Sequence, residues 1–454
     1  MPIFNWKQVV LLVIFASLLI LTACGGSSNS TPPPAGVSLS IAAAPSTIGA
    51  GANYQYSATV SGTTDQGVAW KASAGTIDSN SGVFIAPSTA PATVTITATA
   101  AADASKFATA TVSVQATDPL GTVNSYTQLQ SCSGSVPNGT CFSMAISCPG
   151  VADLSAYLKV NNPQGAPVGT VLLNTGTGGN GLYDDPTAGG YDFGQNVVQS
   201  LILAGYNTVQ ISFGAPFNDN QKSGWLQGPG GPRRLACRYA TVADWVYNNP
   251  KVVNPGVSVA NSKPMCATGN SGGSAAIAYA AFEYGLDSEL AMIEPTSGPV
   301  MSRIDQGCSP CSASVVGNVC ANSSNVPNMC YLDADAKIID EAYRPAGATT
   351  PTLCSDGLNN HANASLTAQF LSDSILYGGS TQNLNMPNTI LKQLLADEDT
   401  SNAVPQATTW EGQVTPSSSS PSPRFACLAN VDHDIPSFSA GATQIAADVI
   451  ANCH

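Results

Sequence analysis

Alternation of apolar strand-like runs with helical patterns limits most strongly how this 454-residue chain can fold. Strands that alternate with helices predict a parallel sheet with helices packed on it. In such a sheet, binding and catalytic residues are expected where strands end and helices begin. The strand-like runs are at 169–174, 206–212 and 264–268, and the helical patterns are at 193–204, 239–249 and 273–284.

One strand-to-helix loop carries a nucleophile pattern. Residues 269–273 match G-x-S-x-G, directly before the alanine-rich helix. Ser271 at such a turn would have a strained backbone, so its neighbours two positions away must be small, and Gly269 and Gly273 are. The amide of Gly272, at the helix N-terminus, would then face a developing oxyanion. A capped helix after a glycine turn is the alternative interpretation.

A glycine-rich loop at 174–181 follows an earlier strand-like run. Its glycines would let backbone amides face a cavity, and the amide of Thr177 is the expected second oxyanion donor. The loop could instead cradle a phosphate. It lacks the Lys-Ser/Thr ending of a P-loop, however, and no acidic residue follows about 20 positions beyond a dinucleotide-binding pattern. We therefore favour acyl transfer over nucleotide binding.

A serine nucleophile needs a general base, and the chain has 3 histidines. His433 follows the apolar run at 425–429 and precedes a helical pattern at 440–450, which predicts a strand-to-helix loop. His361 lies in a polar stretch, and His454 is the last residue. We therefore expect His433 to be the base, with a generic surface histidine as the alternative.

The acid that orients the histidine is expected after the strand-like run at 389–395. We choose Asp399, although spacing alone leaves Asp397 and its neighbours open, and the loop could simply be a solvated acidic segment. Two further carboxylates flank the histidine itself. The acidic residues in the two loops are Asp397, Glu398, Asp399, Asp432 and Asp434.

Residues 117–454 resemble the α/β-hydrolase fold family, with serine, acid and histidine in that chain order. The segment departs from the family pattern at Thr175, where a histidine is frequent, and at Ala396, where a glycine is usual. The resembling segments are the nucleophile elbow at 269–273, the acid-bearing turn at 394–399 and the histidine loop at 432–436.

The resemblance implies a role for each candidate. Ser271 would be the nucleophile, His433 the general base and then acid, and Asp399 the group that orients His433. The amides of Thr177 and Gly272 would form the oxyanion hole. The family's lid position corresponds to about 300–376, which we expect to bind substrate.

The first residues predict export. Lys7 precedes an apolar run at 9–21, followed by small residues and Cys24, which is the layout of a secretory signal at 1–23. The segment ending in Cys24 resembles a bacterial lipobox, which implies lipidation of that cysteine and an anchor on a membrane surface. An uncleaved membrane anchor is the alternative. We expect an exported protein at the outer membrane or cell surface, with a flexible tether at 24–36.

Residues 37–116 contain short period-two runs separated by turn residues, which predicts an all-β sandwich. This segment resembles bacterial immunoglobulin-like domains of group 2. Trp70 is expected in the sandwich core rather than at a binding site. The predicted role of this domain is a spacer or a weakly adhesive module.

The cysteine count agrees with export. The chain has 13 cysteines, so lipidation of Cys24 leaves twelve that could form six disulfides. Zinc at Cys308, Cys311, Cys320 and Cys330 is the alternative, but thiolate sites of that kind are favoured in reducing compartments. We therefore expect a disulfide-braced lid, with pairings that spacing does not determine.

Charge narrows the possible functions. The net charge is −13 and no basic run offsets it, so nucleic acid is excluded as an expected partner. We predict a lipid-anchored hydrolase of small-molecule or polymeric carboxylic esters, with no cofactor and no metal. An exported serine peptidase and a non-catalytic surface-binding protein are the alternatives. Acyl and alcohol preference and oligomeric state stay open.

Overall fold

The computed structural model describes residues 36–214, 224–253, 264–311, 320, 328–361, 363–378, 382 and 384–454. The predicted signal peptide, Cys24 and nearly all of the predicted tether lie outside these residues. Within the described ranges, no helix is long and apolar enough to cross a membrane. Every element below belongs to a single unit, Val37–His454.

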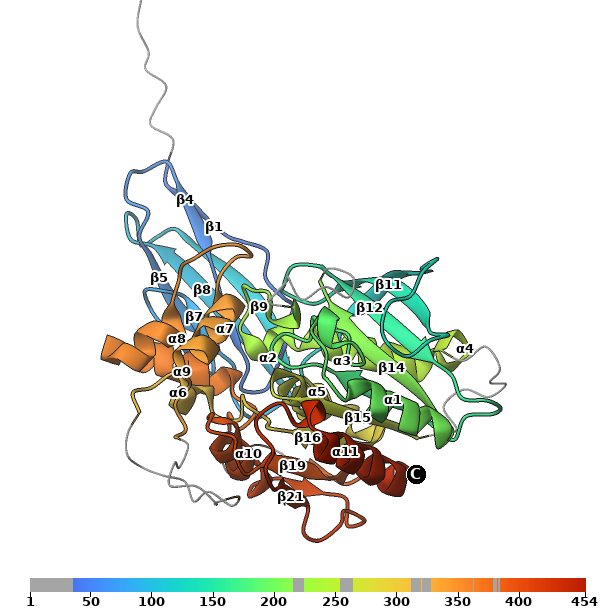
Figure 1. The fold of residues 1–454 in the computed structure, drawn as a ribbon. Helices are drawn as coiled ribbons and strands as arrows, with labels where there is room; N and C mark the ends of the chain where they lie inside the picture. The colour runs from blue at the N-terminus through green and yellow to red at the C-terminus, as the bar shows by residue number, and fades with distance from the viewer. Residues whose placement is uncertain are drawn as a thin grey trace, which may run out of the picture. The chain divides into compact units, whose positions relative to one another are not determined.

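The predicted parallel sheet forms most of a ten-stranded sheet with the order β10-β11-β12-β14-β13-β15-β16-β19-β21, in which β18 also pairs with β16. Figure 1 labels its strands β11, β12, β14, β15, β16, β19 and β21. Pairing is antiparallel from β10 to β14 and parallel from β14 to β21. The strands are β10 (Thr122–Gln128), β11 (Thr140–Ser147), β12 (Leu154–Asn161), β13 (Gly169–Asn174), β14 (Tyr206–Phe213), β15 (Met265–Asn270), β16 (Leu290–Thr296), β18 (Ile390–Leu391), β19 (Gln393–Ala396) and β21 (Phe425–Leu428). A separate pair is β17 (Asn385–Met386) with β20 (Thr415–Pro416).

Both faces of the parallel strands are buried. Along β13, Leu172 packs in one apolar cluster, whereas Val171 and Leu173 pack in another, because successive side chains point to opposite faces. Helices α3 and α5 contribute to the first cluster, and α1 and α11 to the second. The helices are α1 (Gly194–Leu203), α2 (Pro232–Leu235), α3 (Cys237–Asn248), α4 (Pro250–Val253), α5 (Gly272–Phe282), α6 (Ile304–Gly307), α7 (Asp333–Tyr343), α8 (Leu353–Asp356), α9 (Ala364–Asp373), α10 (Ala403–Glu411) and α11 (Ser439–Asn452). Shorter helical turns are η1 (Pro186–Ala188), η2 (Gly224–Leu226), η3 (Leu286–Ser288), η4 (Gly357–His361) and η6 (Ile435–Ser437).

The N-terminal β-strands form small sheets around their own apolar core. Trp70 is 7% exposed and lies in this core with Tyr56 and Phe84, as the sequence analysis predicts. The sheets have the orders β2-β9-β8-β5, β3-β7-β6 and β1-β4. Their strands are β1 (Ser38–Ile41), β2 (Thr47–Gly49), β3 (Asn53–Gln55), β4 (Ala58–Ser61), β5 (Val68–Ala72), β6 (Thr76–Ile77), β7 (Val83–Ile85), β8 (Ala92–Ala100) and β9 (Phe107–Gln115).

A buried arginine on α2 bonds these N-terminal strands to the rest of the unit. Arg233 is 1% exposed, its Nε lies 2.5 Å from Oδ2 of Asp118, and its Nη2 donates to the carbonyl oxygen of Ala50 at 2.9 Å. The amide of Gly49 donates to Asp118 at 2.9 Å. Burial raises the pKa of the adjacent Glu283 to about 8, although Arg233 opposes the shift. Arg233 therefore lies between Asp118 and the N-terminal strands and links the two.

Replacement of Arg233 with methionine tests this contact. Asp118 would be left buried without its partner, and loss of one member of a buried ion pair costs about 3–5 kcal/mol. We expect Arg233→Met to lower the free energy of unfolding by that amount in urea titration. Arg344→Met is the control, because Arg344 is partly exposed, 3.7 Å from Glu341, and pairs of that kind contribute about 0–1 kcal/mol. Equal losses in the two variants would contradict the role of Arg233.

Candidate active site

Ser271 occupies the turn between β15 and α5. Its φ of 52° and ψ of −119° fall outside the regions that residues other than glycine ordinarily adopt. The turn leaves no space for larger neighbours: a Cβ at Gly269 would lie 2.8 Å from the backbone of Gly273, and one at Gly273 would lie 2.6 Å from the carbonyl oxygen of Thr175. The amide of Ser271 donates to the carbonyl oxygen of Thr296 at 2.9 Å. The serine is therefore held at the carboxyl end of a central strand.

The two predicted oxyanion donors lie beside the serine. Thr177 has a φ of 52°, and Gly272 is the first residue of α5. Within the described part of the chain, the amides of Thr177 and Gly272 donate to no acceptor. The amide of Gly176, by contrast, donates to the hydroxyl oxygen of Tyr191 at 2.8 Å. Thr177 and Gly272 can therefore donate to a ligand oxygen placed next to Ser271.

His433 lies on the loop between β21 and α11, and Asp399 on the loop between β19 and α10. Nδ1 of His433 is 2.8 Å from Oδ2 of Asp399, whose side chain is fully buried. Ser401 supports the pair, because its amide donates to Asp399 at 2.8 Å and its Oγ lies 3.2 Å from Nδ1 of His433. Asp397, which spacing left open, instead accepts from the amide of Val431 at 3.5 Å. The structure thus brings Asp399 to the imidazole.

The other two histidines lie away from Asp399, whereas Asp432 and Asp434 stay beside His433 in its loop. His361 is exposed in η4, and His454 is exposed at the end of the chain. Asp432 accepts from the amide of His433 at 2.7 Å. Neither His361 nor His454 lines the cavity described below.

The residue before the serine holds the histidine loop. Nδ2 of Asn270 donates to the carbonyl oxygen of His433 at 3.2 Å and to Oδ1 of Asp434 at 3.3 Å. Oδ1 of Asn270 accepts from the hydroxyl of Thr296 at 2.8 Å, which fixes the amide orientation. The sequence analysis missed Asn270, because the G-x-S-x-G pattern leaves this position unspecified.

Nearby carboxylates control the protonation of His433. Burial disfavours its charged form, but the hydrogen bond and charge of Asp399, together with the charges of Asp434 and Asp335, raise the pKa of His433 above 6.5. Burial likewise opposes ionisation of Asp399, yet hydrogen bonds from His433 and Ser401 lower the pKa of that carboxyl. The arrangement stabilises the imidazolium that forms when a general base accepts a proton.

Ser271 and His433 line one cavity of about 260 Å³, with Thr177 and Gly272 also in its wall. Helix α7 closes one side of the cavity through Asp335. The sequence offers no signal for the side chains of this wall, because nothing in the order of residues shows which face of α7 meets the serine. The other side chains around the cavity include Val300, Met301, Tyr331, Ile338, Ile339 and Asn402.

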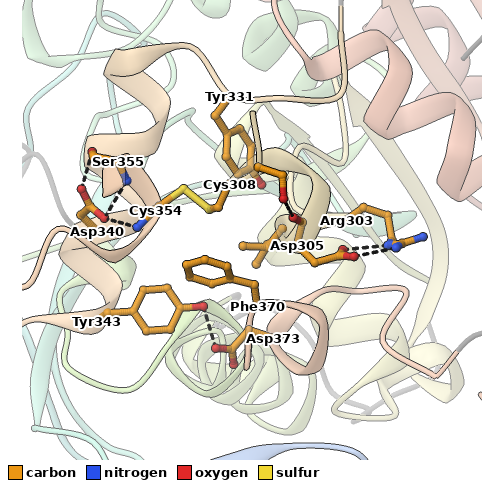
Figure 2. The surroundings of a disulfide bond; sticks show 12 residues. Arg303, Asp305, Cys308, Tyr331, Asp340, Tyr343, Cys354, Ser355, Phe370 and Asp373 are labelled. Atoms are coloured by element: carbon orange, nitrogen blue, oxygen red, sulfur yellow. Dashed lines mark hydrogen bonds and ion pairs between the residues drawn. A yellow bond between two sulfur atoms is a disulfide. The ribbon is translucent and has the colours of Figure 1, made fainter. Parts of the chain in front are cut away.

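Hydrogen bonds connect α7 to α8, and a disulfide connects α8 to α6. The bond between Cys308 and Cys354 joins the end of α6 to α8, as Figure 2 shows. Asp340 of α7 accepts from the amide of Cys354 and from the hydroxyl of Ser355, both at 2.6 Å. These contacts attach α8 to the helix that forms the cavity wall.

All twelve cysteines after Cys24 are paired, so the zinc alternative is wrong. Cys308, Cys311, Cys320 and Cys330 each bond to a cysteine. In the described ranges, no group of histidine, cysteine and acidic side chains could hold a metal ion. The pairs are Cys132–Cys141, Cys148–Cys237, Cys266–Cys453, Cys308–Cys354, Cys311–Cys330 and Cys320–Cys427.

The bond between Cys320 and Cys427 ties the predicted lid to β21 across 107 residues. Its removal in the double variant Cys320→Ala, Cys427→Ala should lower the free energy of unfolding by about 2–4 kcal/mol, because the unfolded chain gains freedom. Equilibrium unfolding measures the loss. Full reduction of the parent protein should lower its melting temperature by more than the double variant does. An unchanged melting curve on reduction would contradict a disulfide-braced lid.

No family model and no curated protein matches this chain. Solved structures that are similar to it include a lipase in an open form, at 13% identity and a TM-score of 0.34, over 66% of this chain and 94% of that one. A carboxyl esterase from Bacillus coagulans in complex with glycerol is 12% identical, with a TM-score of 0.37, over 72% and 97%. An acetyl xylan esterase from Paenibacillus sp. R4 is 11% identical, with a TM-score of 0.39, over 73% and 89%.

The protein has an α/β-hydrolase-like fold. Its central sheet is mostly parallel, and Ser271 stands at a sharp turn from the central strand β15 into α5. The histidine and its acid follow strands further along the same sheet.

Proposed function

We propose that this protein hydrolyses carboxylic esters through an acyl-serine intermediate on Ser271. One arrangement supports the proposal above all. A serine at a strained strand-to-helix turn shares a cavity with His433, and Nδ1 of His433 lies 2.8 Å from the buried Asp399. The amides of Thr177 and Gly272 are the oxyanion donors.

In the acylation half, His433 takes the proton of the Ser271 hydroxyl as Oγ bonds to the carbonyl carbon. The carbonyl electron pair moves to its oxygen, which Thr177 and Gly272 stabilise through their amides. The imidazolium then protonates the alcohol oxygen as the carbon–oxygen bond breaks. In the second half, water gives a proton to His433 and attacks the acyl carbon, and Ser271 regains its proton as the acid leaves. Ester and water thus become acid and alcohol.

We also propose a domain organisation and a cellular location for this protein. The catalytic domain would span 117–454 with a lid at about 300–376, after an immunoglobulin-like domain at 37–116, and the buried position of Trp70 supports the second assignment. Cys24 would carry lipid after removal of residues 1–23, and would anchor the exported protein at the outer membrane or cell surface.

The role of Ser271 predicts a specific loss. Ser271→Ala should reduce ester turnover by about a thousandfold or more, because the covalent intermediate no longer forms. A fluorophosphonate probe should label the parent protein and leave the variant unlabelled. Ser437→Ala is the matched control, since Ser437 does not line the cavity. Undiminished turnover by a folded Ser271→Ala variant would reject the proposal, and turnover of peptide amide substrates by the parent protein would support the peptidase alternative.

The raised pKa of His433 predicts how activity depends on pH. Only neutral imidazole accepts the serine proton, so kcat/KM should fall as acid protonates His433. Because Asp399, Asp434 and Asp335 raise that pKa, we expect the acidic inflection above pH 6.5. A kcat/KM profile from pH 5 to pH 9 measures it. Activity that stays constant down to pH 5 would contradict a base role for His433.

A further inference from the structure

We propose that the cavity beside Ser271 selects esters that carry a hydroxyl group, and that Asp335 of α7 recognises this group. The inference rests on the proposed function and adds a substrate class to it. Its basis is the mixed wall of the cavity, in which the carboxylate of Asp335 lies among the apolar side chains of Met301, Ile338 and Ile339.

The cavity fits a short group. Its volume of about 260 Å³ lies below the range of roughly 300–1,000 Å³ usual for small-molecule sites. Met301, Ile338 and Ile339 supply apolar walls. The hydroxyl of Tyr331 is already used, because it donates to the carbonyl oxygen of Val300 at 3.0 Å. A saturated chain of a few carbons would satisfy these walls, but not the remaining polar groups.

Asp335 places a carboxylate in the wall of this cavity. The side chain is half-buried and lies close enough to His433 for the two charges to interact. The carboxylate of Asp335 already forms one hydrogen bond, with the backbone of Leu332, the residue before α7. A carboxylate has about four acceptor positions, and leaving them unfilled on exclusion of water is unfavourable. A donor on the substrate would fill one.

Asn402, the residue before α10, also lines the cavity and is 4% exposed. Its Nδ2 is itself buried and within the described ranges has no hydrogen-bond acceptor, so a rotation of the side chain toward the cavity would supply the complementary donor. Asp335 can only accept, whereas the Asn402 amide nitrogen can only donate. A hydroxyl group does both, an ammonium group only donates, and a carboxylate only accepts. The pair of residues therefore favours a hydroxyl.

A second, wider cavity continues the same chemistry. It has a volume of about 1190 Å³, and Ile338 and Asp434 line both cavities. The hydroxyls of Thr349 and Thr352 and the carboxylate of Asp333 lie in its wall. These groups would form hydrogen bonds with a hydroxylated extension of the substrate. Lys337 and Arg344 also line this cavity, but its carboxylates outnumber them and would disfavour an anionic extension; these carboxylates are Asp333, Asp340, Glu341, Asp356 and Asp434.

Matched ester pairs test the proposal in a pH-stat assay with the full chain. In the first pair, methyl β-hydroxybutyrate is compared with methyl butyrate, which places the hydroxyl on the acyl side. In the second pair, ethylene glycol monoacetate is compared with propyl acetate, which places the hydroxyl on the alcohol side. Acetylcholine against its uncharged carbon isostere tests a cation, and monomethyl succinate tests an anion. We expect kcat/KM to favour the hydroxyl ester by about tenfold or more in one of the first two pairs, with the anion as the poorest substrate.

Two variants assign the preference to Asp335. The quantity compared is kcat/KM for the favoured hydroxyl ester divided by kcat/KM for its matched ester. Asp335→Leu should bring this ratio close to one, whereas Asp335→Asn keeps an acceptor oxygen and should retain part of the preference. Asp192→Asn is the charge-loss control, because Asp192 is exposed and lines neither cavity, and it should leave the ratio within about twofold. Melting curves check that each variant is folded.

The outcomes separate this inference from the proposed function. Turnover of all esters without a hydroxyl preference, a larger preference for the cation, or an unchanged ratio in a folded Asp335→Leu variant would each overturn the role of Asp335 while ester hydrolysis stands. A folded parent protein that cleaves none of the esters would overturn both.

Discussion

Close backbone packing around Ser271 is the constraint on which the rest of the site depends. The register of the sheet places Asn174 opposite Gly269, so the loops after β13 and β15 leave it side by side. A side chain at Gly272 would collide with the carbonyl oxygen of Thr177, and one at Gly273 with Thr175. Two parallel neighbouring strands, with glycine where their loops touch, therefore bring two free amides and one hydroxyl to the same place.

The histidine side of the site depends on buried polar contacts. Asn270 connects the serine turn to the loop of His433, so one residue couples the positions of Ser271 and His433. Asp399 is fully buried against Nδ1, whereas Asp434 and Asp335 add charge from the histidine loop and from α7. Asp434 and Asp335 also line the cavity beside Ser271, so the carboxylates that raise the pKa of His433 give this cavity acidic walls.

Much of the fold was predictable because parallel strands and their helices leave local patterns. The run at 169–174 is β13, and the alanine-rich pattern at 273–284 corresponds to α5. The predicted strand at 264–268 extends to Asn270, because the sheet continues pairing up to the serine. Contacts across the chain were not predictable: the N-terminal strands, expected to act as a spacer, share the buried Arg233 and Asp118 pair with the larger sheet.

The amino-acid sequence by itself determined the order of strands and helices, the serine turn and the loop of His433, because each depends on residues that are neighbours along the chain. The tertiary structure alone decided that Asp399 rather than Asp397 meets the imidazole, which cysteines pair, and that Asp335 and Asn402 line the cavity. These outcomes depend on distances between segments far apart in sequence. Such distances arise only when apolar burial brings the segments together.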